Sequence, residues 1–363
     1  MPTTDSDKVD GTNVDRAIEF VRVQTDRNRR SIKNGLRHYA RLDRPPISST
    51  PKDTVWQRDK VRLWRYRSEN RSGGPPLLLV HSLVNRSYIF DLVPGNSMVE
   101  VLLARGQDVY LVEWGIPDAA DAENSFETYC DDYLPEIADF VVANSEADDL
   151  NLLGYCFGGI LALLYAAGHT EAPIRSLTTL ATPTDMTKMP AQLRGSAGSS
   201  FDPALVIDET GNVPGPVIGN AIRSLTPTAD FAAKASLLAN LWNDDYVAAH
   251  NAITLWGDDQ IPFAGETFRQ MTQMLSNDNG FVNDRLTLGG RRVSLGDITV
   301  PFLNVFGSKD HIVPAAASRP LSALVGSTAV TDLELAAGHV GLFIGRRAHQ
   351  VGVPAMLDWI EGQ

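Results

Sequence analysis

The chain has 363 residues, of which 43% are hydrophobic and 21% charged, a balance typical of a folded globular protein with one or two domains. This composition excludes a disordered, fibrous or collagen-like chain. Lys and Arg total 32 against 44 Asp and Glu, so the formal charge is −12. A negative balance argues against a nucleic-acid binder, because such proteins usually carry a basic surface.

Targeting signals and cysteine content indicate the cellular compartment. No run of 18 apolar residues occurs, so we expect no transmembrane span. The N-terminal segment 1–16 lacks a basic start followed by an apolar stretch, which argues against a secretory signal. Cys130 and Cys156 are the two cysteines, too few for a disulfide framework. We therefore expect a cytoplasmic protein with free thiols.

The first predicted element is a basic helix over 15–42, preceded by a polar tail, so that tail and helix together occupy 1–50. Ile32, Leu36 and Tyr39 have helical spacing, and Arg44-Pro45-Pro46 ends the pattern. Two interpretations remain open: a solvated helix that packs one stripe on the body, or a docking helix for an acidic partner or a lipid or polymer surface. Its basic residues are Arg16, Arg22, Arg27, Arg29, Arg30, Lys33, Arg37 and Arg41, against Glu19 and Asp26.

Short apolar runs that alternate with helical patterns follow this helix. Continuous apolar strands of this kind are typical of a parallel sheet with helices on both faces. The predicted strands are Val61–Tyr66, Leu77–Val80, Val109–Val112, Leu150–Leu153, Ser176–Leu180 and Phe302–Phe306, with helices near 96–105, 126–144 and 158–168. We expect an α/β core over 51–182 and 298–363. The irregular stretch between them, with helical pieces near 229–242 and 264–276, predicts an inserted cap over 183–297.

The run Gly154-Tyr155-Cys156-Phe157-Gly158 lies between a predicted strand and a predicted helix. It matches the nucleophile elbow Gly-x-Ser-x-Gly with cysteine in place of serine. Such a tight, strained turn needs glycine on both sides. The N-terminus of the following helix favours the thiolate form of Cys156, and the Phe157 N–H is free to bind an oxyanion. The alternative is a buried structural cysteine, which is our interpretation of Cys130.

An acid and then a histidine should follow this type of nucleophile along the chain. Asp310 follows the last predicted strand of the core, and His339 lies between glycine-rich residues after the apolar stretch Ala329–Leu335. We predict that His339 acts as the general base and that Asp310 orients its imidazole. His311 could compete as the base, but a residue adjacent to Asp310 can hardly receive its hydrogen bond in triad geometry. We therefore assign His311 to the substrate pocket or to a supporting position beside it, and the alternative is a histidine that packs in the turn.

The second oxyanion donor should follow the strand Leu77–Val80. The backbone N–H of Leu83 and that of Val84 are both candidates, and the sequence does not choose between them. A cysteine nucleophile forms a thioester, so transfer of an acyl group from a thioester substrate to Cys156 is nearly isoenergetic. The cysteine therefore favours acyl transfer from a substrate such as an acyl-CoA over hydrolysis.

Several motifs together resemble polyhydroxyalkanoate synthase over roughly residues 40–360. They are Gly154-Tyr155-Cys156-Phe157-Gly158-Gly159, Leu83-Val84-Asn85-Arg86-Ser87-Tyr88, Val112-Glu113-Trp114-Gly115, Gly265-Glu266-Thr267-Phe268-Arg269-Gln270, Gly289-Gly290-Arg291-Arg292-Val293 and Lys309-Asp310-His311-Ile312-Val313-Pro314. The resemblance implies an α/β-hydrolase fold with a cap that excludes water. It also implies polymerisation of (R)-3-hydroxyacyl-CoA, such as 3-hydroxybutyryl-CoA, with release of CoA, where Cys156 carries the acyl group.

The resemblance also implies partners. The length is similar to that of the short, class III-like, two-subunit synthases, so we expect a second non-catalytic subunit and contact with a nascent polyester granule in the cytoplasm. A homodimer is compatible with it. No metal or organic cofactor is expected, because no ligand cluster or dinucleotide motif occurs, and the CoA thioester is substrate.

Two other classes of function remain open. A cysteine-type α/β hydrolase is one, either dienelactone-hydrolase-like, a thioesterase or a polyester depolymerase. The spacing of 154 residues from Cys156 to Asp310 argues against the dienelactone-hydrolase type, in which this spacing is shorter. A non-catalytic granule-coating protein is the other, and an intact set of Cys156, Asp310 and His339 argues against it.

Overall fold

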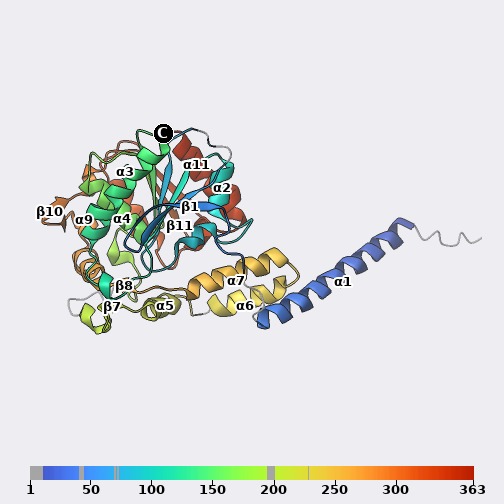
Figure 1. Cartoon of the computed structure of the whole chain (residues 1–363). Helices are drawn as coiled ribbons and strands as arrows, with labels where there is room; N and C mark the ends of the chain where they lie inside the picture. Colours follow the sequence, from blue (N-terminus) through green and yellow to red (C-terminus); the bar gives the residue numbers. More distant parts are fainter. Residues whose placement is uncertain (1–10, 41–44, 69–70, 72, 194–200, 228) are drawn as a thin grey trace, which may run out of the picture. The chain divides into compact units, whose positions relative to one another are not determined.

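The computed structural model describes the chain except residues 1–10, 41–44, 69–70, 72, 194–200 and 228 (Figure 1). Packing divides the chain into two units. One comprises Met1–Pro45 with Thr228–Thr254, and the other comprises Pro46–Pro227 with Leu255–Gln363. The predicted polar tail and the predicted end of the basic helix at 41–42 lie largely outside the described residues. Within them the helix is α1, Gly11–Tyr39, and begins earlier than the predicted residue 15.

An eight-stranded sheet forms the centre of the larger unit, in the order β1-β2-β4-β3-β5-β6-β11-β12. From β4 onward the neighbours pair in parallel, whereas β1 and β2 form an antiparallel edge. The strands are β1 Lys52–Arg58, β2 Val61–Tyr66, β3 Leu77–Val80, β4 Val109–Glu113, β5 Leu150–Tyr155, β6 Ile174–Leu180, β11 Phe302–Gly307 and β12 Val330–Leu335. The predicted α/β class with a mostly parallel sheet is confirmed.

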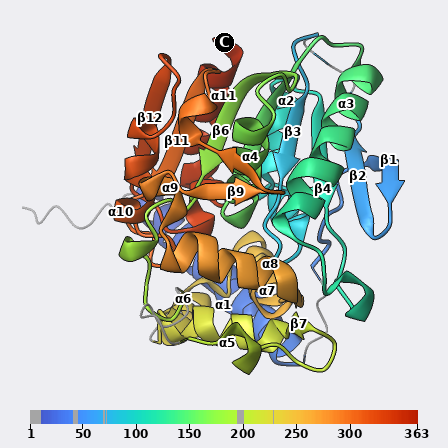
Figure 2. The same cartoon turned by 90° about the vertical axis from the view of Figure 1, so that its left-hand side faces the viewer.

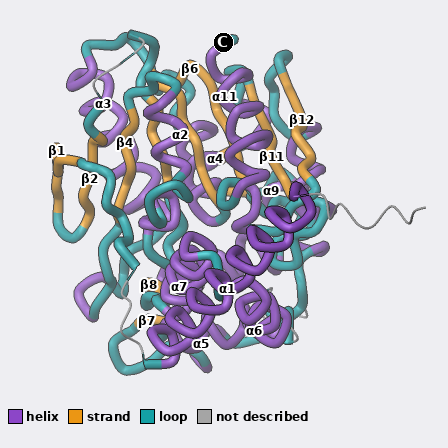
Figure 3. The backbone as a smooth tube through the Cα atoms, turned by 90° about the vertical axis from the view of Figure 1, so that its right-hand side faces the viewer, coloured by secondary structure: helices purple, strands orange, loops and turns teal. Residues whose placement is uncertain are grey.

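Helices cover both faces of this sheet, which explains why its central strands are buried and mostly apolar. All residues of β3, β5 and β11 are buried. Figures 2 and 3 show α3 and α4 on one face and α2 and α11 on the other. The helices of this unit are α2 Met98–Ala104, α3 Leu134–Ser145, α4 Phe157–Gly168, α5 Gly215–Ser224, α8 Gly265–Gln270, α9 Gly280–Asn283, α10 Ala315–Ser318 and α11 Val353–Glu361.

The predicted insertion contains more regular structure than its composition indicated. Its small strands form two antiparallel pairs. In one, β7 Asn212–Val213 pairs with the distant β8 Phe263–Ala264, and the other is a hairpin of β9 Leu286–Leu288 with β10 Arg291–Val293. The boundaries 183–297 stay a prediction. Residues 229–254 of this stretch belong to the unit that contains the N-terminal helix.

The smaller unit is helical and consists of α1, α6 (Ala229–Asn240) and most of α7 (Asp244–Asp258). Asn34 of α1 donates to the Leu241 carbonyl oxygen at 2.8 Å and to Asp244 at 2.6 Å. Arg27 lies over the Trp242 ring. These contacts fix one face of α1 against the turn between α6 and α7. Of the helices in the described part of the chain, none is long and apolar enough to cross a membrane.

Candidate active site

Cys156 lies in a strained turn between β5 and α4. Its φ is 53° and its ψ −119°, in the left-handed region that disfavours side chains. A Cβ on Gly154 would lie 2.5 Å from the Gly159 Cα, and one on Gly158 would lie 2.6 Å from the His81 carbonyl oxygen. The glycines are therefore required by close backbone approach, as the elbow motif predicts, and the turn holds the thiol beyond the end of the strand.

The sheet brings Asp310 and His339 to the same edge as Cys156. β5, β6, β11 and β12 are parallel neighbours, so their carboxyl ends lie together. Asp310 follows β11, where Lys309 N–H donates to the Ala337 carbonyl oxygen at 3.1 Å. His339 follows β12. Residues far apart in the sequence therefore come together because adjacent strands end side by side.

Asp310 is held by hydrogen bonds to both carboxylate oxygens. Its Oδ1 accepts from the backbone N–H of Ile312 at 2.8 Å and of Val313 at 2.9 Å. Its Oδ2 accepts from Nδ1–H of His339 at 2.7 Å, and both side chains are buried. Three donors on one buried carboxylate fix its orientation, so it can hold the imidazole in one tautomer.

His339 connects this carboxylate to the thiol. Burial lowers the pKa of its imidazole, but Asp310 and Cys156 together outweigh burial and raise that pKa to about 10. The Cys156 side chain lies within hydrogen-bonding reach of the ring. Because Nδ1 faces Asp310, Nε2 is the nitrogen left for the sulfur. The three predicted residues thus form one connected chain from carboxylate to thiol.

A cavity of about 580 Å³ opens at Cys156. Ser82, Val84 and Phe157 share its wall with the thiol, and most of the remaining wall is apolar. Ile312 and Val313 also line it, whereas their neighbour His311 is exposed. The pocket role of His311 stays a prediction. Apolar side chains in the wall include Met186, Met189, Val213, Ile218, Phe263 and Phe268.

The predicted oxyanion donors lie close to this wall. Phe157 is the first residue of α4, so its N–H has no carbonyl partner within the helix. Val84 lines the cavity, while Leu83 is buried in the hydrophobic core. The position of Val84 favours its backbone N–H over that of Leu83 as the second donor, and both assignments stay predictions.

Buried polar contacts hold the loop after β3, and the sequence did not reveal them. Glu113, at the end of β4, forms an ion pair with Arg86 at 3.2 Å and accepts from the Ser87 hydroxyl. Trp114 Nε1–H donates to the His81 carbonyl oxygen at 2.8 Å. These contacts fix the loop that carries Val84. The sequence motifs around Arg86 and Glu113 indicated that these residues matter. Only the pairing of β3 with β4 shows that the two side chains meet.

His81 lies close to the elbow but is unsuited to act as a base. Burial lowers the pKa of its imidazole to about 3, and its Nε2–H donates to the Asn85 carbonyl oxygen at 3.0 Å. Its ring stacks on Tyr155, whose ring also contacts His339 at a centroid distance of 5.1 Å. Tyr155 therefore lies between the rings of His81 and His339 and contacts both.

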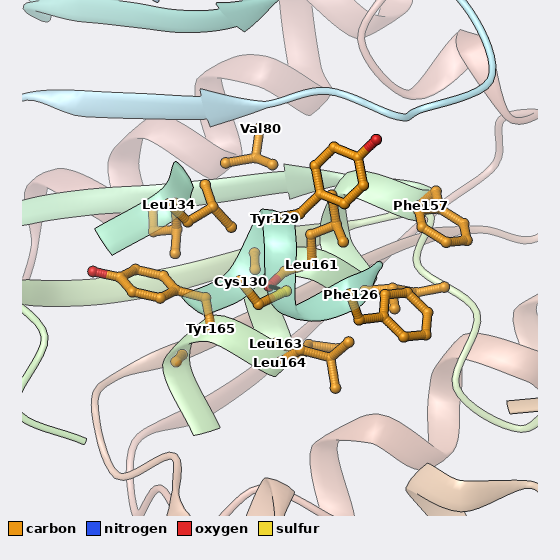
Figure 4. Close-up of a cluster of buried hydrophobic side chains, with 14 of the residues drawn as sticks. Val80, Phe126, Tyr129, Cys130, Leu134, Phe157, Leu161, Leu163, Leu164 and Tyr165 are labelled. Carbon is orange, nitrogen blue, oxygen red and sulfur yellow. Dashed lines mark hydrogen bonds between the residues drawn. The ribbon is translucent and has the colours of Figure 1, made fainter. Parts of the chain in front are cut away.

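Cys130 lies in the hydrophobic core, away from this edge (Figure 4). Its thiol donates to the Leu161 carbonyl oxygen at 3.6 Å. Burial raises the pKa of this thiol well above its ordinary value. The surroundings drawn in Figure 4 are Phe126, Tyr129, Leu163 and other apolar side chains. Its predicted role in packing is confirmed.

Comparison with known proteins identifies the family. The poly(3-hydroxyalkanoate) polymerase subunit PhaC of Allochromatium vinosum is 36% identical over 91% of this chain and 94% of its own. The subunit PhaC of Thiocystis violacea is 34% identical over 91% of this chain and 93% of its own. The subunit PhaC of Synechocystis is 30% identical over 86% of this chain and 85% of its own. The chain belongs to the poly(3-hydroxyalkanoate) polymerase family. It is accordingly an enzyme of the acyltransferase type.

The fold of this polymerase family member is shared with many hydrolases. A family model for the alpha/beta hydrolase fold matches residues 75–345. A hydrolase from Pseudomonas aeruginosa has a TM-score of 0.50 and 15% identity, covering 86% of this chain and 99% of its own. A thermophilic esterase from Thermogutta terrifontis has a TM-score of 0.50 and 14% identity, with coverage of 86% and 98%. These likenesses confirm the α/β-hydrolase fold.

Proposed function

We propose that the chain polymerises (R)-3-hydroxyacyl-CoA, such as 3-hydroxybutyryl-CoA, into polyhydroxyalkanoate with release of CoA, and that Cys156 carries the acyl group as a thioester. The observation that carries this proposal is the connected set of Asp310, His339 and Cys156 at the wall of an apolar cavity. Membership in the polymerase family supports it over a hydrolase.

The first step loads the enzyme. Nε2 of His339 takes the thiol proton, and the sulfur of Cys156 attacks the thioester carbonyl carbon. The oxyanion that forms is bound by the Phe157 N–H and, we propose, the Val84 N–H. The bond to the CoA sulfur breaks, and His339 returns its proton to that sulfur, so CoA leaves as the free thiol. Asp310 stabilises the imidazolium between these two transfers.

The second step forms the ester. The 3-hydroxyl of another hydroxyacyl-CoA attacks the acyl-Cys156 carbonyl carbon, and His339 takes the hydroxyl proton. The carbon–sulfur bond breaks, and the proton passes from His339 to the Cys156 sulfur. The product is a chain longer by one unit on CoA, which the first step transfers to Cys156 again. The same three residues therefore serve both steps.

The apolar cavity favours ester formation over hydrolysis of the acyl thioester. Water at Cys156 would hydrolyse the acyl thioester and end the chain as a soluble acid. An apolar wall that includes Met186, Phe263 and Phe268 favours the acyl chain over water. We propose that the predicted cap over 183–297 contributes this wall, and that no cofactor other than the substrate's own CoA takes part.

The test is CoA release from (R)-3-hydroxybutyryl-CoA by the purified chain, with the acid-insoluble polymer and free 3-hydroxybutyrate measured together. We expect CoA release to be matched by polymer and absent in Cys156→Ala. A matched control is Cys130→Ala, which leaves the proposed nucleophile intact. CoA release matched by soluble 3-hydroxybutyrate would instead show a thioesterase, and unchanged release in Cys156→Ala would remove the proposed nucleophile.

We further propose that the enzyme works at the surface of the growing polyester granule together with a second, non-catalytic subunit. Relatives are named as polymerase subunits, which supports a partner chain. Light scattering of the purified chain with and without a candidate subunit tests this association. A homodimer would give a mass twice that of one chain with no other protein present.

A further inference from the structure

The outer face of α1 carries large apolar side chains that are exposed. Ile18, Val21, Ile32, Leu36 and Tyr39 are each more than 60% exposed. With 3.6 residues per helical turn, these positions fall on one stripe along the helix. The stripe spans about three heptads, the length at which a partner helix can form a stable pair. Its apolar side chains form two groups, near the start and near the end of the helix, and Thr25, Asn28 and Arg29 separate them on the same face.

The opposite face of α1 already has a partner within its own unit. Arg27 lies 4.4 Å from the Trp242 ring centroid, Asn34 bonds Asp244, and His38 bonds Asn251. Helical spacing places these three residues roughly opposite the exposed stripe. The α6–α7 turn therefore does not explain the stripe, whose residues lie on the other side of the helix.

The N-terminal half of α1 carries exposed apolar side chains on two faces. Phe20 and Val23 continue the face that packs against Trp242, yet they lie beyond these contacts and are exposed. Ile18 and Val21 lie on the outer stripe. A flat lipid or polymer surface can cover one side of a helix. Apolar residues on two opposite sides favour a protein partner that surrounds the helix, as in a helical bundle.

The charge of α1 indicates the chemistry of this partner. The helix carries seven basic side chains and three acidic ones, and Arg22, Arg29 and Lys33 form a row along one flank of the stripe. A second copy of α1 would place like charges together, whereas a partner helix with carboxylates beside its apolar seam would be attracted. The basic residues of α1 are Arg16, Arg22, Arg27, Arg29, Arg30, Lys33 and Arg37.

We infer that α1 docks an acidic amphipathic helix of a partner protein along the outer stripe, and that other parts of the same partner cover Phe20 and Val23. The inference deepens the proposed association with a second subunit and rests on it for the identity of the partner. The surface itself is tested without substrate, so its failure is distinguishable from failure of the proposed polymerase activity.

The probe is a synthetic 28-residue peptide with Leu at heptad positions a and d and Glu at e and g, compared with a peptide in which Gln replaces each Glu. Binding to the full chain is measured by fluorescence anisotropy at two salt concentrations. We expect the acidic peptide to bind at least tenfold more tightly than the neutral one, with the difference reduced at high salt. Phe20→Gln with Val21→Gln should weaken binding at least tenfold.

Variants that remove charge from α1 distinguish electrostatic attraction of the peptide from its apolar contacts with the stripe. Arg22→Gln with Arg29→Gln should remove the preference for the acidic peptide, while the matched control Glu19→Gln, on the same half of the helix, should keep it. Equal binding of both peptides to the unaltered chain would overturn the inference. It would also be overturned if Phe20→Gln with Val21→Gln dissociated a dimer of the chain alone, or abolished binding to phosphatidylcholine–phosphatidylglycerol vesicles while peptide binding persisted.

Discussion

The two cysteines lie in the same unit but in opposite environments. Cys156 is partly exposed at the tip of a strained turn and reaches the His339 imidazole. Cys130 is fully buried among apolar side chains, with the Leu161 carbonyl oxygen as its polar contact. The difference shows how the backbone sets the surroundings of a thiol. A sheet edge presents one thiol to a base and a cavity, whereas the core removes the other from water and from any base.

Replacing each cysteine with alanine gives the largest expected difference in activity between the two sites. Cys156→Ala should lower CoA release by at least about 10⁴-fold, because the nucleophile is lost, while its circular dichroism stays unchanged. Cys130→Ala should retain CoA release within about threefold, because this side chain contacts only the core. Steady-state release from 3-hydroxybutyryl-CoA measures both. Equal losses in the two variants would break the contrast.

Asp310→Asn should lower kcat by about 10³- to 10⁴-fold, because an amide no longer fixes the tautomer of His339 or stabilises its charged form. It should also bring the pKa of His339 down toward its ordinary value, since Asp310 is the strongest influence that raises it. NMR titration of the imidazole checks this shift. A variant whose kcat falls while the pKa of His339 is unchanged would argue for a different role of Asp310.

Gly158→Ala tests the backbone contribution to the elbow. A Cβ there would be 2.6 Å from the His81 carbonyl oxygen, a backbone atom that cannot move alone. We expect the free energy of unfolding to fall by at least about 3 kcal/mol, measured by urea denaturation. Gly257→Ala, where a Cβ meets open space, is the matched control and should change stability little. Similar losses in both would remove the close approach as the cause.

The charge on His339 should also appear in the pH dependence of stability. Its folded pKa lies above its ordinary value of 6.5, so the stabilisation is complete below that value and disappears as the pH rises through about 10. His339→Gln should therefore be less stable than the unaltered chain by on the order of 2 kcal/mol at pH 6. This difference should shrink toward pH 10. A gap that widens with pH would reverse the sign of the proposed interaction.

The smallest effect concerns packing around Cys130. Cys130→Ala should lower the free energy of unfolding by about 1 to 2 kcal/mol, because it leaves a small cavity beside Leu161 and loses one weak hydrogen bond. Cys156→Ala should change stability by less than that, since the Cys156 side chain is partly exposed. Urea denaturation of both variants measures these two changes in the free energy of unfolding. A larger loss in Cys156→Ala would show that the elbow, too, depends on its thiol for packing.

The strands, and the meeting of Cys156, Asp310 and His339 at one sheet edge, could be predicted because each depends on short local sequence patterns. Leu77–Val80 is a continuous apolar run and Phe302–Gly307 is apolar except for Asn304, and the order of Cys156, Asp310 and His339 follows from the order of the strands. The edge strand Lys52–Arg58 was missed, since only some of its residues face the interior and the others are polar. The predicted strands were one or two residues too short at β4, β5, β6 and β11.

Features that depend on contacts between distant residues could not be predicted. The helix Asp244–Asp258 has no clear apolar face of its own, and its packing with Asn34 of α1 joins segments about 210 residues apart. The ion pair of Arg86 with Glu113 requires that β3 and β4 be neighbours. The choice between Leu83 and Val84 likewise depends on which of them reaches the cavity.

The segment between β6 and β11 supplies much of the cavity wall, including Met186, Val213 and Phe268, whereas Cys156, Asp310 and His339 lie outside it. The parallel pairing of β6 with β11, Phe302 opposite Leu177, joins the two halves of the sheet directly. Substitutions in this segment can therefore change the cavity wall while Cys156, Asp310 and His339 keep their spacing. We therefore expect that grafting this segment from a relative would change the substrate range of the enzyme without moving Cys156, Asp310 or His339.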